Sequence, residues 1–252
     1  MDFKVVPTLS KDFPEDNYGI IMSIINKIIG NFPIILLYLY MNLIQSIREL
    51  SAQPLTHQLL LSLLKGYKRP NDKIHELISA GIIEPVKKGI YLPTAKVSPK
   101  RTEPFLLANH LLGPSYVSFD SALSYYGLIP EQVFEISSAT TKASRQFDTL
   151  SGTFSYIRLP LPYYSFGIRQ LQIAENQNIL IASPEKALFD KIINTTGLKL
   201  RSKTLAGDYL LENLRMDEDQ LKHMDTEMME TWLEDSPKRE SLTMIIKVIK
   251  TL

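Results

Sequence analysis

The stretch Ala182-Ser183-Pro184-Glu185-Lys186-Ala187-Leu188-Phe189-Asp190-Lys191 follows an apolar run and marks a change from strand to helix. Ser183 can cap a helix by accepting a backbone N–H, and proline is favoured at the first helical position. Glu185 complements the positive end of the helix dipole. The stretch therefore predicts a strand over 179–182 and a helix over 184–193.

A second helix signal lies upstream, between Ser118 and Pro130. Ser118 suits the N-cap, and Gly127 suits the end of the helix. The apolar residues at helical spacing between them are Ala122, Leu123 and Tyr126. Local structure explains this segment and the previous one separately. It does not explain why they occur in this order around the strand-like Gly152-Thr153-Phe154-Ser155-Tyr156.

Helix and strand signals mix through the second half of the chain. The strand-like runs are 134–137, 152–157 and 179–182, and the helix-like runs are 103–112, 118–126 and 184–193. That mixture predicts an α+β domain. Beyond about residue 201, Leu, Met and Trp recur among many acids. They predict a helical tail whose apolar side chains belong to the core rather than to a binding groove.

Two helices are predicted near the N-terminus, beyond a loose or partly ordered arm. Isoleucines at three- and four-residue steps favour an amphipathic helix over 18–29, and a more apolar helix follows over 34–50. The apolar run over 34–44 is shorter than the ~20 residues that span a bilayer. We therefore expect a buried helix there, and no membrane segment.

The next segment has the pattern of a winged helix-turn-helix. Short helices are predicted after Pro54 and after Pro70, with a Gly-containing turn between them. Two strand-like runs, 82–86 and 89–92, then flank a Lys-Lys-Gly turn that is typical of a β-hairpin. In this arrangement the hairpin is the wing, and the helix after Pro70 enters the DNA groove.

The positive charge of the chain is concentrated in this segment. Residues 65–101 hold nine basic and three acidic residues, a net charge of +6, whereas the whole chain carries +1. Such a basic block is typical of a nucleic-acid contact, because neutralising phosphates contributes much of the binding free energy. The alternative is an ordinary solvated charged face.

Eight residues are the candidates for DNA contact. They are Lys65, Lys68 and Arg69 at the turn, Asn71, Lys73 and His75 on the helix, and Lys87 and Lys88 at the wing. Asp72 and Glu76 share the same helix, and no arginine lies on it to make a bidentate guanine contact. The pattern therefore favours affinity from phosphate contacts over strong sequence specificity.

The order of the segments over about residues 85–195 resembles the C-terminal domain of the AbiEi-type antitoxins, regulators of abortive-infection phage-defence systems. The markers are Lys88-Gly89-Ile90-Tyr91, Ser118 to Pro130, Thr140-Thr141-Lys142, Gly152 to Tyr156 and Ala182 to Lys191. The resemblance implies a winged helix-turn-helix followed by this domain. It also implies a repressor of its own operon that opposes a nucleotidyltransferase-like toxin encoded beside it.

The positions that match the motifs of that family are the candidate residues of the antitoxin domain. They are Ser118, Asp120, Tyr126, Gly127, Thr141, Gly152, Thr153, Phe154, Pro184, Glu185, Lys186 and Asp190. The chain departs from the family pattern at its start, since about 50 residues precede the helix-turn-helix that contains the basic block.

Composition limits the chemistry that the chain can perform. It has no cysteine and only four histidines, none in a tight ligand pair, so we expect no metal site and no cysteine nucleophile. A Gly-rich phosphate loop ending in Gly-Lys-Ser/Thr, a Gly-x-Ser-x-Gly elbow and a paired-acid metal motif are all missing. We therefore expect no catalytic residues and no cofactor. The start of the chain lacks the pattern of a signal peptide, which predicts a cytoplasmic protein.

These observations predict an α+β protein with an N-terminal helical region, a winged helix-turn-helix and an α+β C-terminal domain with a helical tail. The expected divisions are an arm and helix over 1–33, a DNA-binding domain and linker over 34–101, and the antitoxin-like domain over 102–252. The expected partner is double-stranded operator DNA, bound by a homodimer or by several cooperating copies. The alternative is a non-catalytic protein-interaction module without specific DNA binding.

Overall fold

The computed structural model describes residues 34–252. The arm and helix expected over 1–33 lie outside the described residues. By the contacts between residues, the chain divides into two units, 1–45 and 46–252. Helix α2, Ile34–Glu49, occupies the range predicted for an apolar helix. Within the described part of the chain, no helix has the length and the apolar composition that crossing a bilayer requires.

A small antiparallel sheet and two short helices follow α2. The elements are β1 (Leu55–Thr56), α3 (His57–Leu63), α4 (Pro70–Ser79), β2 (Ile83–Lys87) and β3 (Ile90–Pro93), and the strand order is β1-β3-β2. Thr56 caps α3, because its hydroxyl accepts from Leu59 N at 3.2 Å. Gly89 sits in the β2–β3 turn with φ +84°, a conformation that glycine adopts without strain. The predicted hairpin is therefore present.

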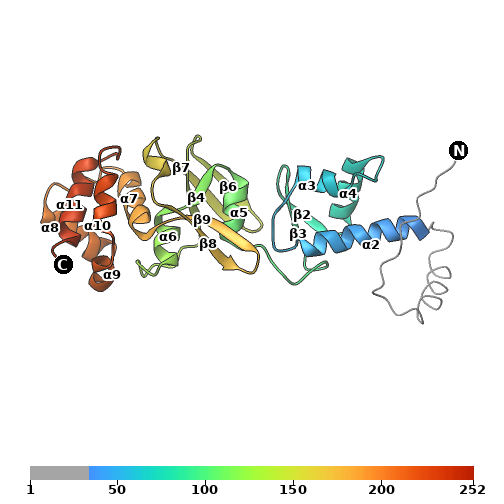
Figure 1. The fold of residues 1–252 in the computed structure, drawn as a ribbon, viewed down its shortest axis with the longest axis horizontal. Coiled ribbons are helices and arrows are strands. Elements are labelled where there is room, and N and C mark those ends of the chain that lie inside the picture. The colour runs from blue at the N-terminus through green and yellow to red at the C-terminus, as the bar shows by residue number, and fades with distance from the viewer. Residues whose placement is uncertain (1–33) are drawn as a thin grey trace. The chain divides into compact units, whose positions relative to one another are not determined.

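A six-stranded mixed sheet forms the centre of the second half of the chain (Figure 1). Its strands are β4 (Ser115–Val117), β5 (Ile136–Thr140), β6 (Arg145–Thr149), β7 (Gly152–Arg158), β8 (Ile168–Ala174) and β9 (Gln177–Ala182), in the order β6-β7-β5-β4-β9-β8. The pairs β4–β9 and β5–β7 are parallel, and the other pairs are antiparallel. The predicted mixed α+β class is confirmed.

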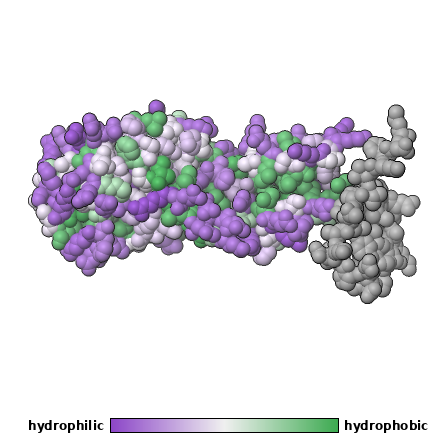
Figure 2. All heavy atoms as spheres, in the orientation of Figure 1, coloured by the Kyte–Doolittle hydropathy of each residue, from purple (hydrophilic) through white to green (hydrophobic). Residues whose placement is uncertain are grey.

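Three helices pack with this sheet, and a helical tail follows them (Figure 1). The three are α5 (Pro104–Leu111), α6 (Phe119–Tyr125) and α7 (Pro184–Asn194). The tail consists of α8 (Lys203–Asp208), η3 (Tyr209–Asn213), α9 (Glu218–Lys222), α10 (Thr226–Thr231) and α11 (Arg239–Ile249). Met229 and Trp232 are buried, as expected for core residues. Figure 2 shows a mostly hydrophilic surface over the tail.

One predicted cap is wrong and one is confirmed. Ser183 accepts from Lys186 N at 3.2 Å and caps α7, as expected. Ser118 occupies the N-cap position of α6 but makes no capping hydrogen bond. Its hydroxyl instead donates to the buried carboxylate of Asp190 at 2.6 Å.

Candidate functional site

The outer face of α4 carries exposed polar residues, while Ile74 and Leu77 of the same helix are buried. Asn71 and His75 are exposed on this face. Lys73 is half-buried, and its ammonium lies 2.6 Å from a carboxylate oxygen of Glu76. A ligand phosphate would therefore compete with Glu76 for Lys73, whereas Asn71 and His75 stand clear of the core.

Three further cations lie at the N-terminal side of α4. Lys65, Lys68 and Arg69 are exposed, and Arg69 lies 3.6 Å from Asp72 in an open ion pair. Exposed ion pairs contribute little free energy and are readily exchanged for a phosphate contact. The six candidates around α4 therefore form one polar surface, in which Lys73 is the most constrained member.

The two lysines of the hairpin differ in their surroundings. Lys88 lies exposed in the β2–β3 turn. Lys87 donates from Nζ to the carbonyl oxygen of Leu111 at 2.6 Å, and its ammonium lies 4.6 Å from the centroid of the Phe147 ring. Burial, followed by the charges of Arg145 and Lys142, lowers the pKa of Lys87 below its ordinary value. Lys87 is thus partly committed to internal contacts.

Substitutions should separate these two lysines. Lys87→Gln removes the cation that holds the Leu111 carbonyl and covers Phe147, so we expect it to lower the free energy of unfolding by about 1–2 kcal/mol. Lys88→Gln removes only an exposed charge, and its effect should stay within about 0.5 kcal/mol. Urea unfolding of the two variants measures the difference. Equal stability of both variants would show that the Lys87 contacts are not maintained in solution.

Asp190 is the centre of a buried polar cluster that joins α7, β4 and η2 (Tyr163–Ser165). Its Oδ2 accepts from the hydroxyls of Ser118 at 2.6 Å and Tyr116 at 3.0 Å. Its Oδ1 accepts from the Tyr163 hydroxyl at 2.7 Å and from Lys186 Nζ. The Lys186 ammonium also lies 3.5 Å from the centroid of the Tyr163 ring. Both members of this ion pair are fully buried.

Burial governs the protonation of this cluster. Desolvation lowers the pKa of Lys186 below its ordinary value, and the charge of Asp190 opposes that shift. Desolvation, reinforced by Asp190, raises the pKa of Tyr116 and of Tyr163 above the ordinary value of a phenol. With four donors on one buried carboxylate, the cluster joins distant parts of the chain. Lys186 and Asp190 hold the domain and present no atoms to a partner.

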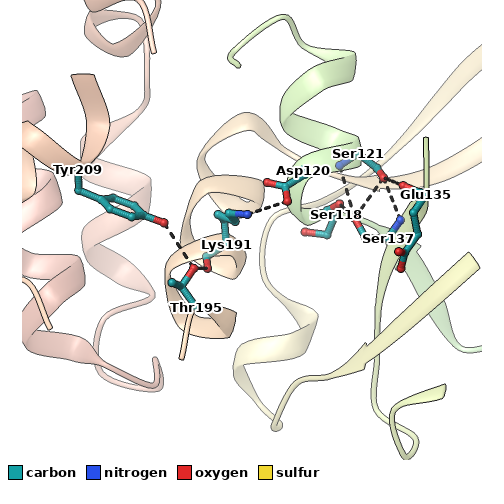
Figure 3. Close-up of polar contacts among 8 residues, drawn as sticks. All are labelled: Ser118, Asp120, Ser121, Glu135, Ser137, Lys191, Thr195 and Tyr209. Carbon is teal, nitrogen blue, oxygen red and sulfur yellow. Dashed lines mark hydrogen bonds and ion pairs between the residues drawn. The ribbon is translucent and has the colours of Figure 1, made fainter. Parts of the chain in front are cut away.

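A second polar network links α6 to β5 and α7 (Figure 3). Ser137 Oγ donates to Ser118 O at 3.0 Å, and Ser121 Oγ donates to Glu135 O at 3.0 Å. Figure 3 shows Lys191 of α7 reaching Asp120 of α6, at 2.6 Å. These two side chains are 26% and 39% exposed, so the pair is accessible to solvent. Asp120 is therefore a motif residue that a partner could reach.

The remaining motif residues are spread over several elements. The Tyr126 hydroxyl donates to Ala182 O at 2.9 Å, and Gly127 ends α6 with φ +69°. Thr141 is half-buried after β5, and Gly152 begins β7 with φ +124°. Thr153 donates to Asp148 Oδ1 at 3.0 Å, and Phe154 beside it is buried. Pro184 opens α7. The structure does not gather these residues into one site.

Glu185 is a buried motif residue with one carboxylate oxygen that lacks a hydrogen bond. Its carboxylate is buried, and Oε1 accepts from Asp225 N at 3.3 Å. Oε2 has no hydrogen-bond partner and lies 3.9 Å from Arg169, within range of an ion pair. The attraction between Arg169 and Glu185 is weak, because Arg169 is half-exposed and water screens its charge. The ion pair therefore does not replace the hydrogen bond that Oε2 lacks. Glu185 therefore connects α7 to the tail.

The alkaline stability of the sheet domain should depend on Tyr156. Its hydroxyl donates to Ala108 O at 2.5 Å, and burial raises its pKa above the ordinary 10.0. The phenol of Tyr156 ionises near pH 10 in the unfolded chain, but only at higher pH in the folded protein. The free energy that Tyr156 contributes to folding is therefore fully present below about pH 10 and is lost as the pH rises above it. Tyr156→Phe should be less stable by about 1 kcal/mol near pH 8, and the difference should narrow near pH 11. Urea titrations at both pH values test this. A difference independent of pH would contradict it.

The chain matches no protein-family model and no curated protein. Its fold is similar to the crystal structure of the RV2827C protein from Mycobacterium tuberculosis, with a TM-score of 0.56 and 15% sequence identity. The match covers 84% of this chain and 77% of that chain. At this identity the likeness establishes the fold alone, which places the chain among mixed α+β proteins of this architecture.

Proposed function

We propose that this chain is a DNA-binding transcriptional repressor that acts as the antitoxin of a toxin–antitoxin system. In this proposal α3, α4 and the β2–β3 hairpin are a winged helix-turn-helix. Helix α4 enters the major groove, and the turn at Lys88 contacts the DNA backbone beside it. The chain has no catalytic role of its own.

The observation that carries the proposal is the distribution of charge over these elements. Leu60 of α3, Leu77 of α4 and Ile83 of β2 are buried. The cations Lys65, Lys68, Arg69 and Lys88 are exposed. The affinity of such a surface for DNA, and the dependence of that affinity on salt, increase with the number of phosphates that its cations neutralise. Asn71 and His75 supply the groups that could read base edges.

The antitoxin role rests on the resemblance in the order of the motifs over residues 85–195. It assigns the six-stranded domain to opposing a nucleotidyltransferase-like toxin. Because Lys186, Asp190 and Phe154 are buried, they support this domain from within. Asp120, which is 39% exposed in its pair with Lys191, is a motif side chain available for an external contact.

Co-expression tests the antitoxin role. The full chain should restore growth to cells that express the toxin encoded beside its gene. The variant Lys68→Glu/Arg69→Glu should lose operator binding and still restore growth, since its substitutions lie outside the six-stranded domain. Failure of the wild-type chain to restore growth would contradict the antitoxin role. Failure of the variant alone would show that the two roles share one surface.

A protein-interaction module without DNA binding is the second candidate. It is favoured by two exposed apolar side chains, since Leu150 in the β6–β7 turn is 95% exposed and Phe134 is 84% exposed. Single exposed apolar residues are common, so this observation weighs less than the basic surface. The second candidate predicts that the chain has no salt-sensitive affinity for DNA.

A further inference from the structure

A cavity of about 440 Å³ lies in the helical tail, at the start of α8 and α11. Its lining residues are Leu200, Arg201, Arg239, Glu240, Thr243 and Met244. The two walls are joined by a hydrogen bond from Leu200 N to Ser241 Oγ at 3.0 Å. A volume of this size is within the range of small-molecule sites, about 300–1,000 Å³. None of these residues belongs to the proposed DNA-binding or antitoxin surfaces.

Two arginines give the cavity its chemistry. Arg201 and Arg239 are exposed, and neither guanidinium has an ion pair or hydrogen bond with any residue in the described range 34–252. Arg215, by contrast, pairs with Glu131, and Arg48 donates to Val97 O. Planar guanidinium groups bind phosphate oxygens in a bidentate manner. The two unpaired arginines therefore favour a ligand that carries phosphate.

The rest of the lining suits a nucleoside. Met244 is half-buried and offers an apolar surface to an aromatic base, whereas Leu200 is buried and adds little to it. The Glu240 carboxylate can accept hydrogen bonds from the amino group of a base or from ribose hydroxyls. The geometry points to a nucleotide-binding site in this cavity, with Arg201 and Arg239 on the phosphates and Met244 against the base.

The neighbouring charge favours a small nucleotide over duplex DNA. Residues 217–235 hold eight acids and one lysine, a net charge of −7. This segment includes α10, which packs against α11, and Lys250 near the end of α11 pairs with Glu230 of α10 at 2.7 Å. A long duplex lying on the arginines would also meet this acidic surface, whereas a nucleotide would occupy the cavity alone.

Isothermal titration of the full-length protein tests the site, with ATP and inorganic pyrophosphate as probes in the absence of divalent metal. We expect saturable binding of ATP, with weaker binding of pyrophosphate because it lacks the base. Arg201→Gln and Arg239→Gln should each weaken ATP binding by about tenfold or more. The matched control is Arg158→Gln, which removes an exposed arginine at the end of β7 and should leave ATP binding unchanged. Thermal melting should be the same for all three variants, since each changes an exposed side chain.

Three results would overturn the assignment. The first is a folded wild-type protein that shows no saturable ATP binding. The second is an affinity for ATP that is unchanged in both arginine variants, or an affinity of the wild-type protein for pyrophosphate that equals its affinity for ATP. The third is loss of duplex DNA binding in these variants, which would assign the arginines to nucleic acid instead. The proposed repressor role is measured separately through Lys68 and Arg69, so failure of one proposal does not imply failure of the other.

Discussion

Replacing Asp190 with alanine should lower the free energy of unfolding by about 3–5 kcal/mol, the cost of removing one member of a buried ion pair. The substitution leaves the Lys186 ammonium in a fully buried position without its anion. It also leaves the hydroxyls of Tyr116, Ser118 and Tyr163 without their acceptor. Urea unfolding of the purified variant near neutral pH measures the loss.

The matched control is Asp120→Ala, which removes a carboxylate from an ion pair of similar length at the surface. Asp120 and Lys191 are partly exposed, so water replaces the lost contact, and the cost should be about 0–1 kcal/mol. Equal destabilisation by the two substitutions would contradict the view that the Asp190 cluster holds the domain together. A fully folded Asp190→Ala protein with wild-type stability would contradict it as well.

The double variant Lys68→Glu/Arg69→Glu should weaken binding to DNA by about 100-fold or more at low salt. Both side chains are exposed beside the first turn of α4, where the proposal places DNA phosphates. If each cation neutralises one phosphate, the slope of log affinity against log salt should fall by about 2. Fluorescence anisotropy with a labelled duplex, repeated across a salt series, measures both quantities.

A control variant with the same change of charge separates a local contact from the charge of the whole chain. Lys199→Glu/Lys203→Glu alters two exposed lysines in the helical tail. Its DNA affinity should stay near that of the wild type. A parallel loss in both variants would indicate that net charge, rather than the surface around α4, determines binding.

Local signals in the sequence predicted most helices because each signal acts over a few residues. Thr56 and Ser183 cap the helices that follow them, and prolines open α4, α5 and α7 as their fixed backbone angle favours. Ser118 shows the limit of this reasoning. Its position relative to α6 is that of a cap, yet its hydroxyl makes no capping contact and donates instead to a carboxylate 72 residues away.

Strands were harder to predict from pattern. The runs assigned to β5, β7 and β9 are apolar or alternating, whereas β4 is only three residues long and was not predicted. Strand β6 lies at the edge of the sheet and is largely exposed, so it lacks the apolar alternation of a half-buried strand. A register shift between Gln172 and Ala174 interrupts the alternation of β8.

The candidate sites also include one that neighbouring residues in the sequence predict and others that depend on contacts between distant residues. Clustering of cations along the sequence predicted the basic block, because its members are near neighbours in the chain. The partners of Asp190 could not be predicted, since Tyr116 and Tyr163 approach it only after the sheet has formed. The placement of Lys87 against Leu111 and Phe147 depends on a similar long-range contact.

The most direct test of the proposed repressor is binding of the full-length protein to the DNA upstream of its own gene, compared with an unrelated duplex of equal length over a salt series. The proposal predicts tighter binding to the upstream DNA, with an affinity that falls steeply as salt rises. Absence of binding to either duplex at low salt would contradict it. The basic surface around α4 would then be an ordinary solvated face.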